Sequence, residues 1–274
     1  MYLSSPPQIS LRGPSVLLVI LGVLALSLAA SAWVYLSAYH SAAGNAPDDR
    51  ISPEATGSPG PTTAAGTPSP TAPPSYAAKG PNTYVYATGE SPVFGSSGTL
   101  RKYRVAIETG TPVPVQDFAA LVDKTLGDPR SWIGGNNVRL QRVAGDAAGV
   151  NFTVLLVTPG TAQDLCLAGN LDIYWHGEPY SSCQVGSRAI INISRYVKGI
   201  PNYGAPLEAY DQYAVNHEVG HVLGHGHELC PAKGQPAPVM QQQTFDLQGC
   251  TANSWPYLDG KRYAGPPGRI IPSD

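Results

Sequence analysis

Alternating apolar and polar positions predict β-strands after residue 100 of the chain. Within several short stretches, apolar residues recur at every second position, which is the period of a strand with one buried face. The expected strands are Tyr103–Thr109, Asn137–Val143, Asn151–Val157, Leu171–Trp175 and Ala189–Ser194. The sequence shows no internal repeat.

Two other segments show the three- and four-residue spacing of a helix. The first is Val115–Gly127, in which the final glycine can end the helix. The second is Leu207–Leu223, preceded by Pro206, a residue that suits the first turn of a helix. Its stripe of aligned positions consists of Leu207, Tyr210, Ala214, His217 and His221. The order of elements, one strand, one helix, four strands and one helix, predicts an α+β domain.

An uncharged apolar segment near the N-terminus, Ser15–Ser37, is long enough to cross a membrane. As a helix it would span roughly 35 Å, compared with a bilayer core of about 30 Å. We expect a single-pass anchor in the cell membrane, with residues 1–14 in the cytoplasm and the rest of the chain outside it. A cleaved signal peptide stays open as the alternative, because Ala30-Ser31-Ala32 resembles a cleavage site, and the domain would then be secreted.

Residues 38–80 are expected to form a disordered linker. The segment is built mostly of Pro, Ser, Thr, Ala and Gly, and it offers almost nothing that could enter a hydrophobic core. Residues 81–274 then form a single folded domain. The charge of the chain adds one exclusion: with a net charge of −2 and no run of Lys or Arg, nothing electrostatic favours a nucleic-acid partner.

The strongest chemical signal is a cluster of histidines at the end of the second helix. His217 and His221 are four residues apart, so they project from one face of the helix, one turn from each other. That spacing suits two imidazoles bound to a single zinc ion. Glu218 lies about 100° around the helix, where it can accept a proton from a water on the metal.

The third metal ligand is expected on the chain after this helix. Gly224 can adopt a left-handed conformation that ends the helix, and His227 can then approach the metal from another direction. His225 and Glu228 stay open as alternative third ligands. Three protein ligands would leave the fourth position of a Zn²⁺ ion open to water, as in catalytic zinc sites.

These residues resemble the motif of the metzincin zinc metallopeptidases, HExxHxxGxxH followed by a methionine-containing turn. The matching residues are His217, Glu218, His221, Gly224, His227 and, in the turn, Met240. The chain is also similar to an uncharacterised bacterial family of membrane-anchored metzincin-like proteins. The resemblance implies a mixed twisted sheet of about five strands with a backing helix and an active-site helix. It also implies that Met240 lies under the metal.

The same resemblance implies two further features of a peptidase site. Leu171–Trp175 would be the antiparallel edge strand along which an extended substrate peptide pairs. Some metzincins also carry a tyrosine after the methionine turn that reaches the site, and Tyr257 and Tyr263 are the candidates by position.

The four cysteines lie in the part of the chain that is expected to be exported, where disulfides persist. Of the three possible pairings, we expect the one between nearest neighbours, Cys166 with Cys183 and Cys230 with Cys250. The second bridge would close a loop around Met240. A rival interpretation makes Cys230 a metal ligand.

The sequence therefore predicts a membrane-tethered, zinc-dependent endopeptidase that acts on a peptide or protein substrate outside the cytoplasm. Two alternatives stay open. One is a non-enzymatic envelope module that binds peptides and is stabilised by its metal. The other is a zinc hydrolase of cell-wall peptides, which would use the same residues.

Overall fold

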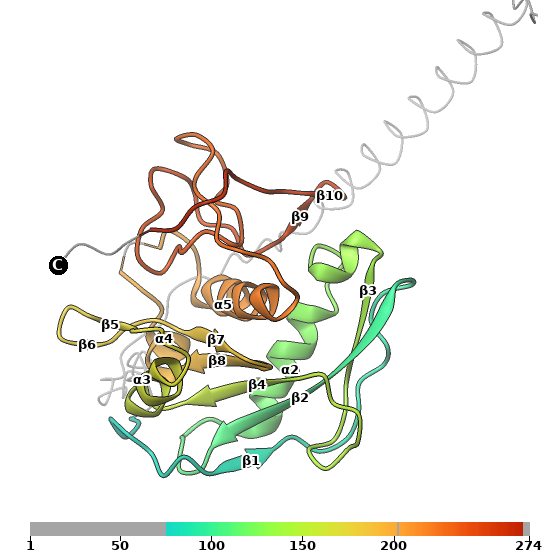
Figure 1. The fold of residues 1–274 in the computed structure, drawn as a ribbon, viewed down its shortest axis with the longest axis vertical. Coiled ribbons are helices and arrows are strands. Elements are labelled where there is room, and N and C mark those ends of the chain that lie inside the picture. The colour runs from blue at the N-terminus through green and yellow to red at the C-terminus, as the bar shows by residue number, and fades with distance from the viewer. Residues whose placement is uncertain (1–74, 202, 271–274) are drawn as a thin grey trace, which may run out of the picture. The chain divides into compact units, whose positions relative to one another are not determined.

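The computed structural model describes residues 75–201 and 203–270 (Figure 1). The expected membrane segment 15–37, and most of the expected linker 38–80, lie outside the described residues. No helix among the described residues combines the length and the apolar character needed to cross a bilayer.

A six-stranded mixed sheet forms the base of the domain. Its strands are β1 (Tyr84–Tyr86), β2 (Thr99–Glu108), β3 (Val138–Arg142), β4 (Phe152–Val157), β7 (Cys183–Val185) and β8 (Arg188–Asn192). The strand order is β1-β2-β4-β8-β7. Both β1 and β3 pair with the same side of the long strand β2, β1 with its C-terminal end and β3 with its N-terminal end. The pairs among β2, β3, β4 and β8 are parallel, whereas β1 and β7 are antiparallel to their neighbours. The predicted α+β class and the mixed sheet are thus confirmed.

Helices cover both faces of this sheet. Because successive residues of a strand point to opposite faces, neighbouring residues of β4 enter two different cores. On one face, Val154 packs into the larger core with α2 (Val115–Leu126) and α5 (Leu207–Val222). On the other face, the next residue, Leu155, packs into a smaller core with α3 (Pro159–Leu167). The central strand β4 is buried along its whole length.

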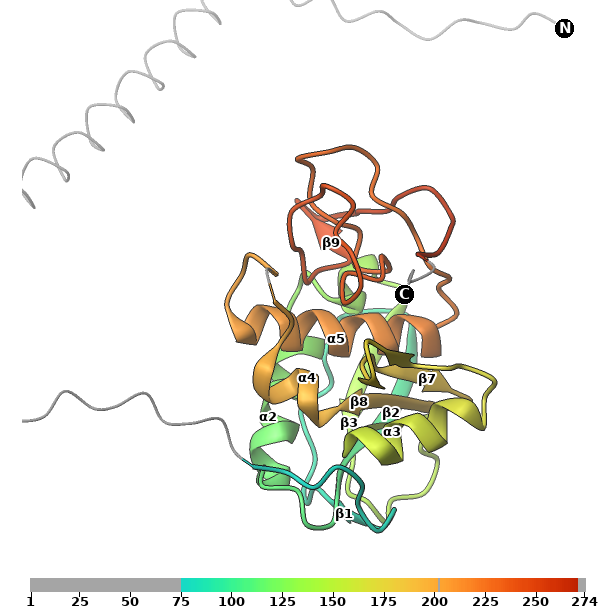
Figure 2. The same ribbon diagram turned by 90° about the vertical axis from the view of Figure 1, so that its left-hand side faces the viewer.

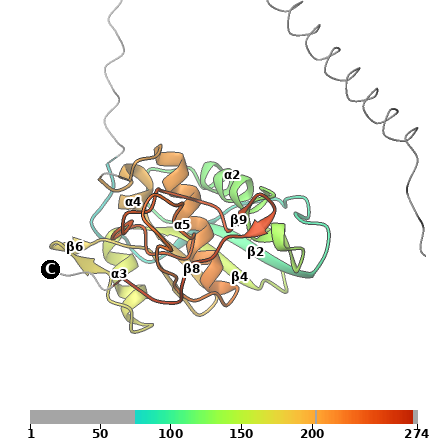
Figure 3. The same cartoon turned by 90° about the horizontal axis from the view of Figure 1, so that it is seen from above.

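The chain after α5 forms a loop-rich cap on the side of this helix that faces away from the sheet (Figures 1 and 2). Its regular structure is a short antiparallel pair, β9 (Tyr257–Leu258) and β10 (Lys261–Arg262). Seen from above, the loops of the cap lie over α5 (Figure 3). The helix is therefore enclosed between the sheet and the cap, and most of its residues are buried.

Both predicted helices are present within a residue or two of their expected bounds. The first is capped at its C-terminus by Gly127, and the second by Leu223, the residue immediately before Gly224. The strand expected at Ala189–Ser194 instead stops at Asn192. The side chain of this asparagine accepts a hydrogen bond from the amide of Ser194, and it thereby begins a short helix, α4 (Ile193–Lys198).

The edge strand expected at Leu171–Trp175 was a wrong prediction. Only Tyr174–Trp175 is a strand (β5), and it pairs with β6 (Glu178–Pro179) in a separate two-stranded sheet. The edge strand of the main sheet beside β8 is instead β7, which is antiparallel to its neighbour. Its three residues are too few to show a recognisable alternation in the sequence.

Ordered packing begins a few residues before the expected domain boundary at Pro81. Tyr76 packs against the larger core, and the amide of Gly80 donates a hydrogen bond to Thr158 Oγ1. The buried carboxylate of Glu108 accepts hydrogen bonds from the amide of Asn82 and from both the amide and the hydroxyl of Thr158. These contacts fix the entry of the chain into the domain beside β2.

Candidate metal centre

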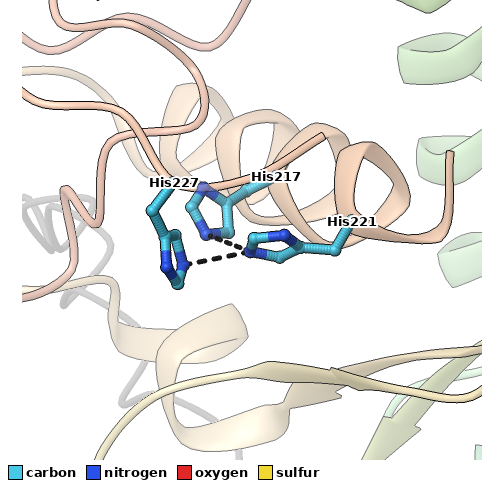
Figure 4. A group of neighbouring side chains, drawn as sticks. All are labelled: His217, His221 and His227. Atoms are coloured by element: carbon cyan, nitrogen blue, oxygen red, sulfur yellow. Dashed lines mark hydrogen bonds between the residues drawn. The ribbon is translucent and has the colours of Figure 1, made fainter. Parts of the chain in front are cut away.

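The C-terminal half of α5 places two histidines of the predicted motif one turn apart. The helix ends just before Gly224, whose φ of 94° lies in the left-handed region that glycine adopts without steric cost. The chain then turns back, and His227 comes to face His217 and His221 (Figure 4). The structure thus brings together the three histidines expected from the sequence.

The three imidazoles converge through their Nε2 atoms. His221 Nε2 lies 3.2 Å from His217 Nε2 and 3.0 Å from His227 Nε2. Two nitrogens bound to one tetrahedral ion at ~2.0–2.1 Å would be separated by ~3.3–3.4 Å. The observed separations are close to that value, so the three rings could share one metal ion.

The Nδ1 atoms of the helix histidines settle which nitrogen carries the proton. His217 Nδ1 lies 2.8 Å from the carbonyl oxygen of Val239, and His221 Nδ1 lies 2.8 Å from that of His225. A carbonyl only accepts, so both Nδ1 atoms must donate. In the neutral rings, each Nε2 then carries a lone pair that points toward the other.

Burial keeps these rings neutral. It lowers the pKa of His217 well below its ordinary value, and the neighbouring His221 and His227 lower it further. Two lone pairs at 3.2 Å repel each other unless a cation lies between them. The protonation pattern of the site therefore fits a bound metal cation.

Glu218 lies beside the three histidines and contributes to the same cavity. Its side chain is buried, and its Oε2 atom has no hydrogen-bond partner among the described residues. Burial raises the pKa of this carboxyl well above its ordinary value. A buried, unpartnered carboxyl in a cavity with three imidazoles is suited to exchanging a proton with a bound molecule.

The cavity at the histidines has a volume of about 500 Å³. One wall comes from the edge strand β7 and the residues just before it, and includes Cys183 and Gln184. The cap contributes Gln242, Phe245, Arg269 and Ile270 to the lining of the cavity. The volume is in the range of pockets that take small ligands or short peptide segments.

The side chain of Met240 is completely buried and packs against α5 between the two helix histidines. A Cβ atom on Gly220, between the two helix histidines, would collide with Met240 Sδ and with the indole of Trp132. The helix therefore needs a glycine at this position to approach Met240 and Trp132 closely. The carbonyl of Val239, the residue before Met240, orients His217.

The alternative metal ligands have other partners. The ring of His225 stacks on Trp132, with centroids 4.2 Å apart. Glu228 forms an ion pair with Arg262 at 2.8 Å. Cys230 forms a disulfide with Cys250, which leaves it no thiolate for a metal.

Neither tyrosine suggested by position reaches the histidines. Tyr257 lies over Gly134 and Gly135 and lines a different, smaller pocket of about 150 Å³. The hydroxyl of Tyr263 donates to the carbonyl of Pro236. The tyrosine that does line the metal cavity is Tyr213 of α5, and its hydroxyl is already hydrogen-bonded to the Gln241 carbonyl and the Gln243 amide.

Both predicted disulfides are present. Cys166–Cys183 joins α3 to the edge strand β7, beside the cavity. Cys230–Cys250 closes the loop that contains Val239 and Met240. Each bridge thus constrains a different wall of the site.

Two residues that support the site were not anticipated from the sequence. Trp132 donates from Nε1 to the carbonyl of Asn216, the residue before the first histidine of the site. The side chain of Asn216 accepts from Ser131 Oγ and donates to the carbonyl of Ser254. These contacts join α5 to one segment well before it in the sequence and to another well after it. A local sequence pattern does not indicate such long-range contacts.

The chain belongs to a protein family described as a protein of unknown function, DUF3152, whose family model matches residues 71–255. The match includes the three histidines, Glu218 and Met240, and it ends before the C-terminal residues that line the cavity. Neither the curated proteins nor the solved structures contain a match to this chain.

Proposed function

We propose that this protein is a zinc-dependent endopeptidase of the metzincin type. The observation that carries the proposal is the meeting of three Nε2 atoms and one buried, unpartnered carboxyl in a single cavity. A site that only stabilised the fold would need no buried acid with a free oxygen. A hydrolytic site needs such an acid to move a proton.

His217, His221 and His227 would hold the metal through Nε2. Imidazole ligands suit Zn²⁺ as well as several other transition metals, and the choice of zinc rests on the resemblance to the metzincin motif. When bound, zinc would supply a Lewis acid that polarises a carbonyl group and makes water more acidic. The two carbonyls at Nδ1 would keep the rings oriented for this role.

Glu218 would act as the general base and then as the general acid. Its carboxylate takes a proton from the attacking water, while the water oxygen forms a bond to the scissile carbonyl carbon. As the C–N bond breaks, the same carboxyl returns the proton to the departing amine nitrogen.

The edge strand β7 would bind the substrate backbone. One edge of β7 pairs with β8, and the β7 residues Cys183 and Gln184 line the cavity. An extended peptide can pair with a free strand edge, main chain to main chain. This assigns to β7 the role that the sequence had suggested for Leu171–Trp175.

We further propose that the domain works outside the cytoplasm, tethered to the membrane by residues 15–37. The apolar character of this segment supports the tether. The two disulfides support the location, since such bridges persist in oxidising compartments.

The test compares the wild-type protein with Glu218→Gln and His227→Ala. Each is loaded with zinc, its metal content is measured, and a mixed peptide library is digested and analysed by mass spectrometry. We expect Glu218→Gln to keep its zinc and lose at least ~10²-fold in turnover. We expect His227→Ala to lose both zinc and turnover.

Two results would contradict the proposal. Turnover by Glu218→Gln at the wild-type rate would remove this residue from the reaction. Peptide binding by the zinc-loaded wild type without any cleavage would favour the non-enzymatic binding module. Parallel digests of cell-wall peptides would show whether those are the preferred substrates.

A further inference from the structure

The last described residues of the chain run alongside the segment that carries His227. The amide of Gly268 donates to the carbonyl of His227 at 3.1 Å, and the amide of Leu229 donates to the carbonyl of Pro266 at 2.8 Å. A Cβ on Gly265 would collide with the backbone of Leu229, so the two segments approach more closely than another residue would allow. The C-terminal segment is thereby fixed relative to the metal centre.

Arg269 is held at the cavity by contacts on both sides. Gly268, before it, is bonded to His227, and the amide of Ile270, after it, donates to Gln242 Oε1 at 2.8 Å. The arginine side chain is exposed and lines the cavity that contains the histidines.

Arg269 forms no ion pair among the described residues, whereas some other arginines of the domain do. Arg142 pairs with Asp123, Arg195 with Glu178 and Arg262 with Glu228. The other acidic side chain in the cavity besides Glu218 is Asp172, and its carboxylate already accepts hydrogen bonds from Gln163 and from the amide of Tyr174. The guanidinium of Arg269, which lines the cavity, thus has no hydrogen-bond or ion-pair partner among residues 75–201 and 203–270.

We propose that Arg269 is a specificity-determining residue that binds a carboxylate of the substrate. The group would be either the side chain of an Asp or Glu near the scissile bond or the C-terminal carboxylate of a short peptide. A guanidinium recognises both through two parallel N–H···O hydrogen bonds. The inference rests on the proposed peptidase function, and Arg269 lies beyond the stretch that the family model matches.

The expected preference is modest and depends on salt. An exposed ion pair changes an equilibrium by up to about fivefold, so we expect about a fivefold advantage for a carboxylate over its amide. The advantage should shrink when the ionic strength is raised, because salt screens exposed charges.

The experiment uses matched peptides and four proteins. In one arm, peptides with an amidated C-terminus carry Glu, Gln or Lys at each position near the cleaved bond. In the other arm, the same neutral peptides end in a free carboxylate or an amide. The proteins are the wild type, Arg269→Gln, Arg269→Glu and Arg101→Glu. Arg101 is exposed and lies outside the metal cavity, so this variant matches the charge change of Arg269→Glu.

For each combination of protein and peptide we would measure kcat/KM. We would also measure the Kd of each peptide for the Glu218→Gln protein and for double variants that combine Glu218→Gln with each of the Arg substitutions. We expect the carboxylate preference to disappear in Arg269→Gln, to turn into a preference for Lys in Arg269→Glu, and to persist in Arg101→Glu. The arm that shows the preference identifies the source of the carboxylate.

The inference is overturned if the wild type does not distinguish carboxylate from amide, or if Arg101→Glu changes the preference as much as Arg269→Glu does. The Kd measurements separate this outcome from failure of the proposed function. If no peptide is cleaved but carboxylate peptides bind better through Arg269, the peptidase proposal fails while the carboxylate site stands.

Discussion

The indole of Trp132 lies flat against the imidazole of His225, with ring centroids 4.2 Å apart and planes inclined by 17°. The backbone carbonyl of the same His225 accepts the Nδ1 proton of His221. The stack therefore fixes His225, whose main-chain carbonyl orients the imidazole of His221, a proposed metal ligand.

The first prediction concerns this stack. His225→Gly removes the ring that anchors the carbonyl, and it should weaken metal affinity by roughly tenfold to a hundredfold. His225→Phe keeps an aromatic ring on Trp132 and should bind metal almost as well as the wild type. Competition with a chromophoric chelator measures both affinities. Loss of metal from His225→Phe as severe as from His225→Gly would instead make the imidazole of His225 a ligand.

The second prediction concerns the turn between His221 and His227. Gly224 has a φ of 94°, and a Cβ there would meet no other atom, so Gly224→Ala tests backbone strain alone. It should lower the free energy of unfolding by about 1–2 kcal/mol. Gly226→Ala is the matched control, because that glycine has no positive φ and its Cβ would also point into open space. Equal losses in chemical denaturation of the two variants would contradict the assigned role of Gly224.

The third prediction distinguishes the two disulfides. They close loops of similar length, with sequence separations of 17 and 20 residues, so removing either pair of cysteines should cost about 3 kcal/mol of stability. Only the loss of Cys230–Cys250 should also weaken metal binding, because that loop carries the Val239 carbonyl that orients His217. The alanine double variants are compared by denaturation and by metal titration. Equal metal affinities in the two would refute this division of roles.

The fourth prediction concerns pH and Asp211, on α5 away from the metal. Burial, and then the neighbouring Glu208, raise the pKa of Asp211 to about 8, and its Oδ1 has no hydrogen-bond partner among the described residues. Between the ordinary value of about 4 and this value, the folded state keeps a proton that the unfolded state has lost. Stability should therefore fall as pH rises from about 4 to 8, by up to about 1.4 kcal/mol per pH unit from this group.

Asp211→Asn should remove that contribution and stabilise the protein at pH 8. Asp128→Asn is the control: the hydrogen bond from Arg130 lowers the pKa of Asp128, so this carboxyl is ionised in both states between about pH 5 and 8. The measurement is the free energy of unfolding across this pH range. A slope that is unchanged in Asp211→Asn would show that Asp211 is ionised in the folded protein.

The cluster of three histidines could be predicted from the sequence because it is mostly local. Two ligands lie one helical turn apart, and Gly224 and His227 follow within six residues. The disulfides join nearest neighbours, and the two long helices carry clear periodic patterns. These features depend on short-range geometry, which residue spacing encodes.

The supporting contacts could not be predicted in this way. Trp132 meets His225 across the fold, and Arg269 reaches the cavity through pairing of the chain's end with the segment after His227. The helix α3 was missed because it is short, although Pro159 at its first turn was an available signal. The edge strand β7 was misassigned because three residues carry almost no periodicity.

The most direct test of the account is X-ray absorption at the zinc edge of the zinc-loaded protein. We expect one zinc per chain, surrounded by three imidazole nitrogens at ~2.0–2.1 Å and one oxygen from solvent. His217→Ala, His221→Ala and His227→Ala should each remove one imidazole from that shell or abolish binding. A shell filled by four protein ligands, or a protein that binds no zinc stoichiometrically, would contradict the proposed catalytic centre.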